Sequence, residues 1–176
     1  MKVFWKARRK NKILSNIKWI LTKDKDSDNY STDEMGWNMI QQYIPKDKKI
    51  WSPFYCDGKQ KEYFRNLGHD IIHEDKDFFT YEPDDYDIIV DNPPFSKLRD
   101  ILNRLKNIDK PFILIMPSSK INAVWFQKMF KDDLQIIIPL KKISFTNLDP
   151  EIPFNFNWGT YYYCYKMELK KDLIIL

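Results

Sequence analysis

The sequence has only two cysteines, no long apolar run and a small net charge, and each shortage excludes something. Cys56 and Cys164 lie far apart and match neither a CxxC nor a Cys/His spacing, which argues against a disulfide framework or a zinc site. No apolar run approaches the roughly 18 residues that span a bilayer. The first residues have no apolar core of the signal-peptide type. Because free thiols suit a reducing compartment, we expect a soluble, intracellular protein of the cytoplasm.

The formal charge of +4 is too small to identify a partner, but it is unevenly distributed. The first 25 residues carry nine Lys or Arg and a single acid, Asp24. A basic arm of this kind either contacts phosphates, with Arg8 and Arg9 as candidates, or is a solvated terminus, and both interpretations stay open. We expect residues 1–30 to form a basic appendage and residues 31–176 to form one domain.

From Ser31 onward, helical patterns alternate with short apolar runs. Helices are predicted over 31–44, with a capped start, and over 61–68, 96–108 and 122–130; strands are predicted over 49–54, 69–75, 86–91, 111–117 and 134–139. Apolar strands that alternate with helices indicate an α/β fold with a mainly parallel sheet that is covered on both faces. The segments 141–145 and 157–167 alternate in polarity, which predicts a C-terminal antiparallel hairpin.

Ligands of such sheets bind beyond the carboxyl ends of the strands. Four polar segments fall at those ends in this sequence. They are SPFYCDG (52–58), HED (73–75), DNPPF (91–95) and MPSS (116–119). The sequence therefore predicts the functional site at this edge of the sheet.

The segment Asn92-Pro93-Pro94-Phe95 has the chemistry to bind an amine on an aromatic ring. The side-chain oxygen of Asn92 and the carbonyl of Pro93 are two acceptors on a backbone that proline stiffens. Together they can hold both hydrogens of one amino group and direct its lone pair at an electrophile. Phe95 offers a flat face for a purine, and such stacking contributes about 1–3 kcal/mol. The alternative is a simple turn, but the position after an apolar strand favours the catalytic interpretation.

YDIIVDNPPFS resembles the catalytic motif D/N/S-P-P-Y/F/W of Rossmann-fold methyltransferases that modify the N6 amine of adenine using S-adenosylmethionine. IWSPFYCDG, GHDIIHEDKDFF and YSTDEMGWNMI are similar to the cofactor-binding segments of that family. The resemblance covers roughly residues 30–167 and is closest to the small, free-standing enzymes of phages and large DNA viruses. It implies a Rossmann-like methyltransferase fold and direct in-line transfer without a metal or a covalent intermediate.

The resemblance also implies roles for individual residues. The catalytic residues would be Asn92, Pro93, Pro94 and Phe95, and the cofactor-binding residues would be Thr32, Ser52, Phe54, Cys56, Asp57, Gly58, Glu74, Asp75, Asp77 and Phe78. Thr32 would help to hold the methionine end of the cofactor, Glu74 its ribose, and Asp77 with Phe78 its adenine. Asp75 would point away if the strand before it continued. The two histidines, His69 and His73, are expected at the surface.

Two positions depart from the family pattern. Ser52 stands where the family usually has an acid, and Cys56 stands where its first glycine is expected. Gly58 is in place, so the chain can still turn sharply there. The missing acid removes a partner for the methionine ammonium group, for which Asp57 could substitute. A catalytically inactive binding or scaffold protein is therefore one alternative, and methylation of a protein glutamine amide is another.

A nucleic-acid partner is expected, with DNA slightly favoured over RNA, because a base must be unstacked or flipped to reach Phe95. The candidate phosphate contacts are Lys97, Arg99, Lys141 and Lys142, besides Arg8 and Arg9. The chain leaves no room for a separate recognition domain. The substrate would then be selected by a specificity subunit, by a homo-oligomer or by the structure of an RNA. The alternative is that the protein has little sequence specificity. Trp158 and the tyrosines near it are candidates for the target pocket, although hairpin core is the commoner role of such a stripe.

Overall fold

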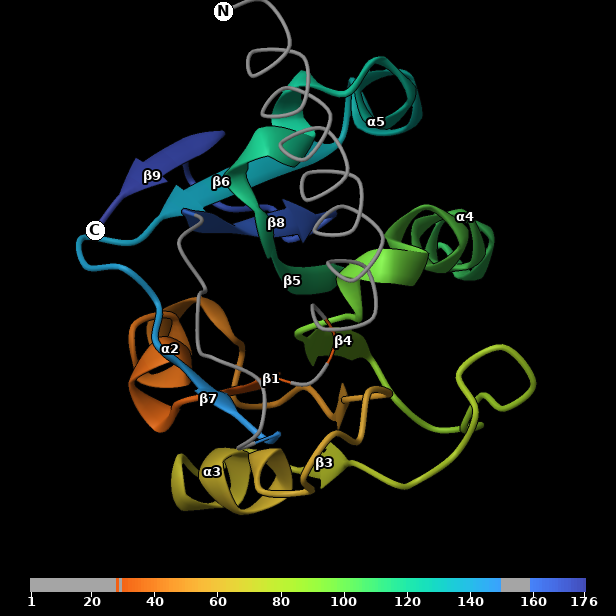
Figure 1. Ribbon diagram of the computed structural model, residues 1–176, viewed down its shortest axis with the longest axis vertical. Coiled ribbons are helices and arrows are strands. Elements are labelled where there is room, and N and C mark those ends of the chain that lie inside the picture. Colours follow the sequence, from red (N-terminus) through yellow and green to blue (C-terminus); the bar gives the residue numbers. More distant parts are fainter. Residues whose placement is uncertain (1–27, 29, 150–158) are drawn as a thin grey trace, which may run out of the picture.

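The computed structural model describes residue 28 and residues 30–149 and 159–176 (Figure 1). Its strands are β1 (Tyr30–Thr32), β2 (Ile50–Trp51), β3 (Ile71–Ile72), β4 (Ile88–Asp91), β5 (Phe112–Pro117), β6 (Leu134–Ile138), β7 (Phe145–Asn147), β8 (Thr160–Tyr165) and β9 (Leu173–Ile175). Its α-helices are α2 (Glu34–Asn38), α3 (Gln60–Asn66), α4 (Leu98–Ile108) and α5 (Val124–Phe130). Three 3₁₀ turns are η1 (Gln41–Tyr43), η2 (Phe95–Lys97) and η3 (Ser118–Asn122).

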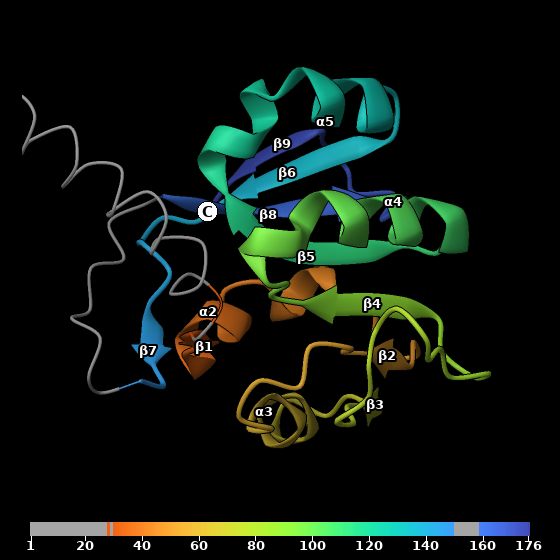
Figure 2. The same cartoon turned by 45° about the vertical axis from the view of Figure 1, so that its right-hand side comes forward.

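Seven strands form one sheet in the order β3-β2-β4-β5-β8-β6-β9 (Figure 2). The strands β3, β2, β4 and β5 are parallel to one another, β8 runs antiparallel between β5 and β6, and β6 is parallel to β9. The predicted fold class is therefore confirmed: this is a Rossmann-like α/β fold with a mainly parallel sheet and one reversed strand. The sheet places the carboxyl ends of β2, β3 and β4 side by side.

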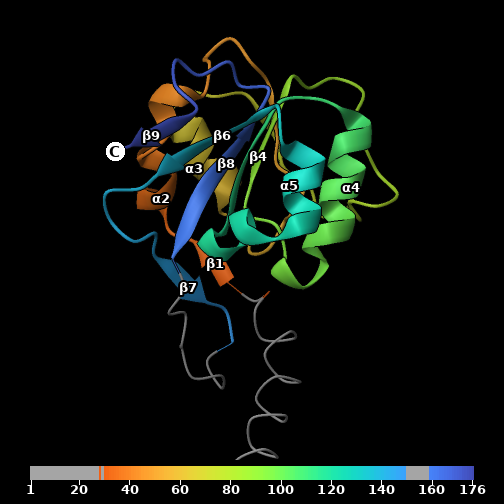
Figure 3. The ribbon, with the colours of Figure 1, turned by 90° about the horizontal axis from the view of Figure 1, so that it is seen from above.

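The helices cover both faces of the sheet, with α2 and α3 on one side and α4 and α5 on the other (Figure 3). Each side has its own apolar core. Trp37 of α2 and Phe64 of α3 pack on Ile88 and Val90 of β4, whereas the buried residues of α4 pack on the opposite face, with Ile89. Because neighbouring residues of β4 point to opposite faces and both faces are buried, the strand reads as an unbroken apolar run.

Most of the predicted elements are present, but the helix predicted over 31–44 is interrupted. Ser31 and Thr32 pair with β7 instead of capping a helix, and Asp33, the residue before α2, makes no side-chain capping bond. The predicted end of α3 at Gly68 is confirmed: this residue has φ +80°, a left-handed conformation that costs glycine little.

The predicted C-terminal hairpin is not formed, although its antiparallel strand exists. Segment 145–147 pairs with β1 in a separate two-stranded sheet, while β8 inserts between β5 and β6. Five of the six β8 residues are buried, as a strand with neighbours on both sides requires. The last strand, β9, had no counterpart in the prediction. Within the described parts of the chain, no helix is long and apolar enough to cross a membrane.

Candidate active site

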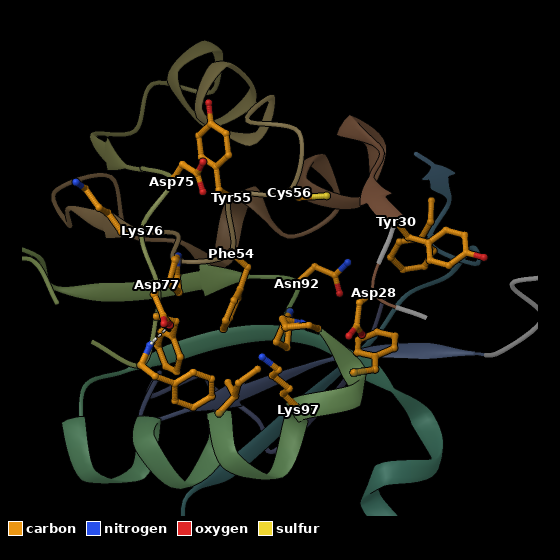
Figure 4. Close-up of a pocket in the computed structure, with 18 residues that line it drawn as sticks. Asp28, Tyr30, Phe54, Tyr55, Cys56, Asp75, Lys76, Asp77, Asn92 and Lys97 are labelled. Carbon is orange, nitrogen blue, oxygen red and sulfur yellow. Dashed lines mark hydrogen bonds between the residues drawn. The ribbon is translucent and has the colours of Figure 1, made fainter. Parts of the chain in front are cut away.

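A pocket of about 300 Å³ opens at the carboxyl ends of β2, β3 and β4 (Figure 4). The predicted segments 52–58, 73–75 and 91–95 all contribute to its wall, and MPSS does not. The wall comprises Asp28, Tyr30, Pro53, Phe54, Tyr55, Cys56, Asp75, Lys76, Asp77, Phe78, Phe79, Asn92, Pro93, Pro94, Phe95, Lys97, Ile101 and Phe145. This volume lies at the lower end of the range for small-molecule sites.

Asn92 lies at the centre of this wall, directly after β4 (Figure 4). Its side-chain oxygen Oδ1 is buried and has no hydrogen-bond donor among the described residues. A buried acceptor without a partner costs about 1–3 kcal/mol, so such groups are uncommon and need an explanation. Pro93 and Pro94 follow without N–H donors of their own, and Phe95 begins η2 at the pocket wall. Asn92 thus has an unused acceptor buried in the pocket wall.

A second orphan group lies in a small cavity beside the pocket. Thr32 is 5% exposed, and its Oγ1 also lacks a hydrogen-bond partner in the described structure. Asp57 and Asn92 line the same small cavity. The carboxylate of Asp57 accepts a hydrogen bond from the backbone N–H of Lys59 and pairs with its ammonium group at 3.0 Å. Although burial opposes the charge of Asp57, the hydrogen bonds from Lys59 and Ser31 prevail and lower its pKa.

The loop after β2 turns as the sequence predicted, but with a strained residue. Cys56 has φ +50° and Gly58 has φ +75°. Cys56 therefore adopts the left-handed conformation that the resemblance assigns to a glycine, at a cost to any residue with a Cβ. A Cβ at Gly58 would lie 2.7 Å from the hydroxyl oxygen of Tyr55. Partial burial and the neighbouring Asp57 raise the pKa of Cys56 to about 11, so the thiol stays protonated near neutral pH.

The segment after β3 places Asp75, Asp77 and Phe78 in the pocket wall. Glu74 is not part of that wall and accepts a hydrogen bond from the hydroxyl of Tyr81 at 2.8 Å. The expected alternation fails because β3 ends at Ile72, so Asp75 reaches the pocket in place of Glu74. Phe78 is 5% exposed, and its ring centroid lies 5.0 Å from that of Phe54.

Both histidines are buried, which corrects the expectation that they lie at the surface. His69 is 4% exposed and contacts the ammonium group of Lys46 at 3.2 Å. His73 is 2% exposed, and its Nδ1 lies 2.8 Å from the backbone oxygen of Ser52. Burial lowers the pKa of both rings.

Several pocket residues were not anticipated from the sequence. Asp28 and Tyr30 fall within the segment expected to be an appendage, and Phe145 belongs to β7. Their place in the wall follows from the β1–β7 pairing, which joins distant parts of the sequence. Asp91, the last residue of β4, is 1% exposed and hydrogen bonded to both neighbouring loops, although nothing in its local pattern distinguishes it from other strand-end acids.

Among the predicted phosphate contacts that the structure describes, only one lines the pocket. Lys97 forms part of its wall, whereas Arg99 lies over the ring of Trp125 at 5.8 Å from the ring centroid. Lys141 and Lys142 are exposed between β6 and β7 and are not part of the wall. Arg8, Arg9 and Trp158 lie outside the described residues. No group of three or more metal-ligating side chains occurs in the described ranges.

The sequence matches no protein-family model and no curated protein. Among solved structures, the fold is similar to the type I restriction-modification system methyltransferase subunit from Streptococcus thermophilus, with 14% identity and a TM-score of 0.47. That match covers 84% of this chain and 47% of the Streptococcus thermophilus subunit, so this chain spans about half the length of that subunit. Precorrin-6y C5,15-methyltransferase from Geobacter metallireducens gives 9% identity, a TM-score of 0.41, and coverage of 80% and 95%.

Proposed function

We propose that this protein is an S-adenosylmethionine-dependent methyltransferase that acts on the N6 amine of adenine in a nucleic acid. The observation that carries the proposal is the buried, unpartnered Oδ1 of Asn92 in the pocket wall, with Phe95 in the same wall. An amino group on an aromatic ring would satisfy this acceptor and stack on that side chain. Within the site, Asn92 would hold one amine hydrogen and the Pro93 carbonyl the other.

The remaining wall fits the cofactor. S-adenosylmethionine supplies an electrophilic methyl group together with an adenosine and a charged methionine end. Phe54 and Phe78 line the pocket as aromatic surfaces for an adenine, and the carboxylates of Asp75 and Asp77 are exposed acceptors beside them. Thr32 and Asp57, which line the adjoining small cavity, would be polar partners for the methionine end. Asp57 carries the negative charge that Ser52 lacks.

A nucleic-acid substrate is supported by the basic and aromatic groups on the target side. Lys97 lines the pocket two residues after Phe95, where its ammonium group can neutralise a phosphate next to the flipped base. The first 25 residues add further positive charge. A specificity subunit or a second copy of the chain would select the site, because these residues offer stacking and charge and no sequence readout.

The test is transfer of a labelled methyl group from S-adenosylmethionine to DNA and to RNA, followed by analysis of the digested nucleosides. We expect N6-methyladenine from wild-type protein and a rate about 10²- to 10³-fold lower from Asn92→Ala. Cofactor binding should be measured first by calorimetry on both proteins. A wild-type protein that binds the cofactor and methylates neither polymer would overturn the proposal.

The same assay separates the other candidates. Label in a glutamine-containing peptide, but not in nucleic acid, would assign the site to amide methylation. A failure of the protein to bind S-adenosylmethionine at millimolar concentration would assign it to the inactive binding class, for which the departures at Ser52 and Cys56 are the relevant features.

A further inference from the structure

We propose that Asp91 is a positioning residue whose ionised carboxylate holds the loop after β2 against the Asn92–Phe95 segment, and that protonation of this carboxylate weakens the hold. This inference rests on the proposed function, since it concerns how the same site is kept in its active geometry. Asp91 itself is not part of the main pocket wall.

The carboxylate of Asp91 joins two separate loops. Its Oδ2 accepts a hydrogen bond from the backbone N–H of Phe54 at 2.7 Å and another from the hydroxyl of Ser52 at 3.0 Å. Its Oδ1 accepts from the backbone N–H of Asn92 at 2.7 Å. Phe54 and Asn92 both line the pocket, so one buried side chain sets the separation of two of its walls.

Hydrogen bonds favour the ionised form of Asp91, whereas burial disfavours it. Ser52 of the loop after β2 and Gln60 of α3 contact Asp91, and Thr32, Cys56 and Asp57 line the same small cavity. His73, after β3, reaches Asp91 only through Ser52. Among the described residues, no lysine or arginine forms an ion pair with it. Burial is the largest influence and raises the pKa of Asp91 to about 7, against the hydrogen bonds from Phe54, Asn92, Ser52 and Gln60.

Protonation of Asp91 would change the hydrogen bonding of this network. Of its four partners, Phe54 and Asn92 offer backbone N–H groups and Gln60 its side-chain amide, all of which donate, so a new O–H on Oδ2 has the Ser52 oxygen as its acceptor. The Ser52 hydroxyl then has to turn away from Asp91. Its other neighbour is Nδ1 of His73 at 2.9 Å, which already lies 2.8 Å from the Ser52 carbonyl oxygen and donates to it in the ionised state.

Protonation of Asp91 therefore changes the hydrogen bonds of Asp91, Ser52 and His73. To accept from Ser52, His73 must move its proton from Nδ1 to the buried Nε2, and it then loses its hydrogen bond to the Ser52 carbonyl oxygen. The protonated arrangement therefore breaks a contact between His73 and the loop after β2, and this loop is less firmly held. Because a misplacement of about 1 Å can cost a reaction about 100-fold, activity should depend on the charge of Asp91.

The experiment compares wild type with Asp91→Asn, a substitution of nearly equal volume that cannot take up or release the proton. The kcat/KM for methyl transfer is measured from pH 5.5 to 8.5. In wild type it should rise to a plateau with a midpoint near 7. In Asp91→Asn the plateau should be about 10- to 100-fold lower and that midpoint should be absent. Asp84→Asn, the same change at an exposed position, should retain the wild-type profile.

A second measurement does not depend on activity. The backbone amide signals of Phe54 and Asn92 in NMR spectra should share one titration midpoint in wild type and lose it in Asp91→Asn. If Asp91→Asn fails to fold, Ser52→Ala serves instead: it keeps the carboxylate, removes one donor, and should shift that midpoint to higher pH. Amides that titrate alike in wild type and Asp91→Asn, or a midpoint that Ser52→Ala leaves in place, would overturn the role of Asp91. Absence of methyl transfer by wild type would overturn the proposed function alone, because the NMR result stands without it.

Discussion

The carboxylate of Asp28 accepts a hydrogen bond at 3.1 Å from the backbone N–H of Ser96, and a second from the hydroxyl of the same residue. Ser96 is the residue directly after Phe95, and Asp28 precedes the first strand. The start of the described chain is thereby tied to the end of the candidate catalytic segment. Both residues of this pair are at least partly exposed, so its contribution is to local order more than to global stability.

Asp28→Ala should therefore loosen η2 without unfolding the protein. We expect faster amide hydrogen exchange at Ser96 and a change in the free energy of unfolding below about 1 kcal/mol, because the bond is exposed to solvent. Asp33→Ala is the matched control: its carboxylate accepts from the hydroxyl of Thr146 at 2.7 Å, away from the catalytic segment. Equal exchange at Ser96 in wild type and Asp28→Ala would contradict the anchoring role.

Asn92→Ala should strongly reduce catalysis and leave the fold intact. Loss of one positioned polar group lowers kcat by about 10²- to 10³-fold, by analogy with oxyanion-hole donors, with little change in cofactor affinity. Because Oδ1 has no hydrogen-bond donor among the described residues, its removal should not reduce the free energy of unfolding. Asn103→Ala, on the exposed side of α4, is the control. If Asn92→Ala keeps wild-type turnover and has a lower melting temperature, Asn92 is only a turn residue.

Phe95→Ala should weaken substrate binding more than turnover. The loss of base stacking is worth about 1–3 kcal/mol, which corresponds to a KM for nucleic acid about 5- to 150-fold higher. Phe95→Tyr keeps the ring and should restore most of the affinity. Phe79→Ala removes a ring beside Asp77, on the cofactor side of the proposed site, and should alter cofactor affinity instead. Fluorescence titration with an oligonucleotide gives the dissociation constants, and equal values for Phe95→Ala and wild type would refute the stacking role.

The sequence was sufficient to locate the site because its main signals are local. An apolar strand followed by Asn92-Pro93-Pro94-Phe95, and a turn ending at Gly58, are each readable from a few consecutive residues. The alternation of helices and apolar strands then places these segments at one edge of a parallel sheet. The structure confirms that they share a pocket.

The sequence was insufficient where a residue's position depends on pairing between distant segments. Tyr30 and Phe145 reach the pocket through the β1–β7 pairing, and that pairing is also why Thr32 is not a helix cap. His73 is buried where the backbone oxygen of Ser52, in the loop after β2, accepts its hydrogen bond. Glu74 and Asp75 exchanged places because a two-residue strand ends before its alternation can extend to them. Each of these outcomes depends on tertiary contacts that no local pattern specifies.

Cys56→Gly should stabilise the protein. Cys56 has φ +50°, where a Cβ costs about 1–2 kcal/mol, and the greater freedom of glycine in the unfolded chain offsets about 0.5–1 kcal/mol of that gain. We expect a net increase of about 0.5–1 kcal/mol in the free energy of unfolding, measured by urea denaturation. Cys56→Ala removes the thiol but keeps the Cβ and should give no such increase. A gain with alanine equal to that with glycine would exclude backbone strain as the cause.

The raised pKa of Asp91 predicts an unusual dependence of stability on pH. The ordinary pKa of an aspartate, 3.8, applies to the unfolded chain, whereas the folded value is about 7. Between these values the folded protein binds a proton that the unfolded chain has released. The contribution of Asp91 to stability is therefore fully present below pH 3.8 and is lost as the pH rises through about 7, with a slope of up to about 1.4 kcal/mol per pH unit.

Asp91→Asn cannot titrate, so the unfolding free energy of the variant minus that of wild type should increase from pH 4 to pH 7 and then level off. Urea denaturation at each pH measures this difference, in which the titration of His69 cancels because both proteins contain it outside the Asp91–Ser52–His73 network. A difference that is constant over this range would show that Asp91 is ionised throughout and carries no switch.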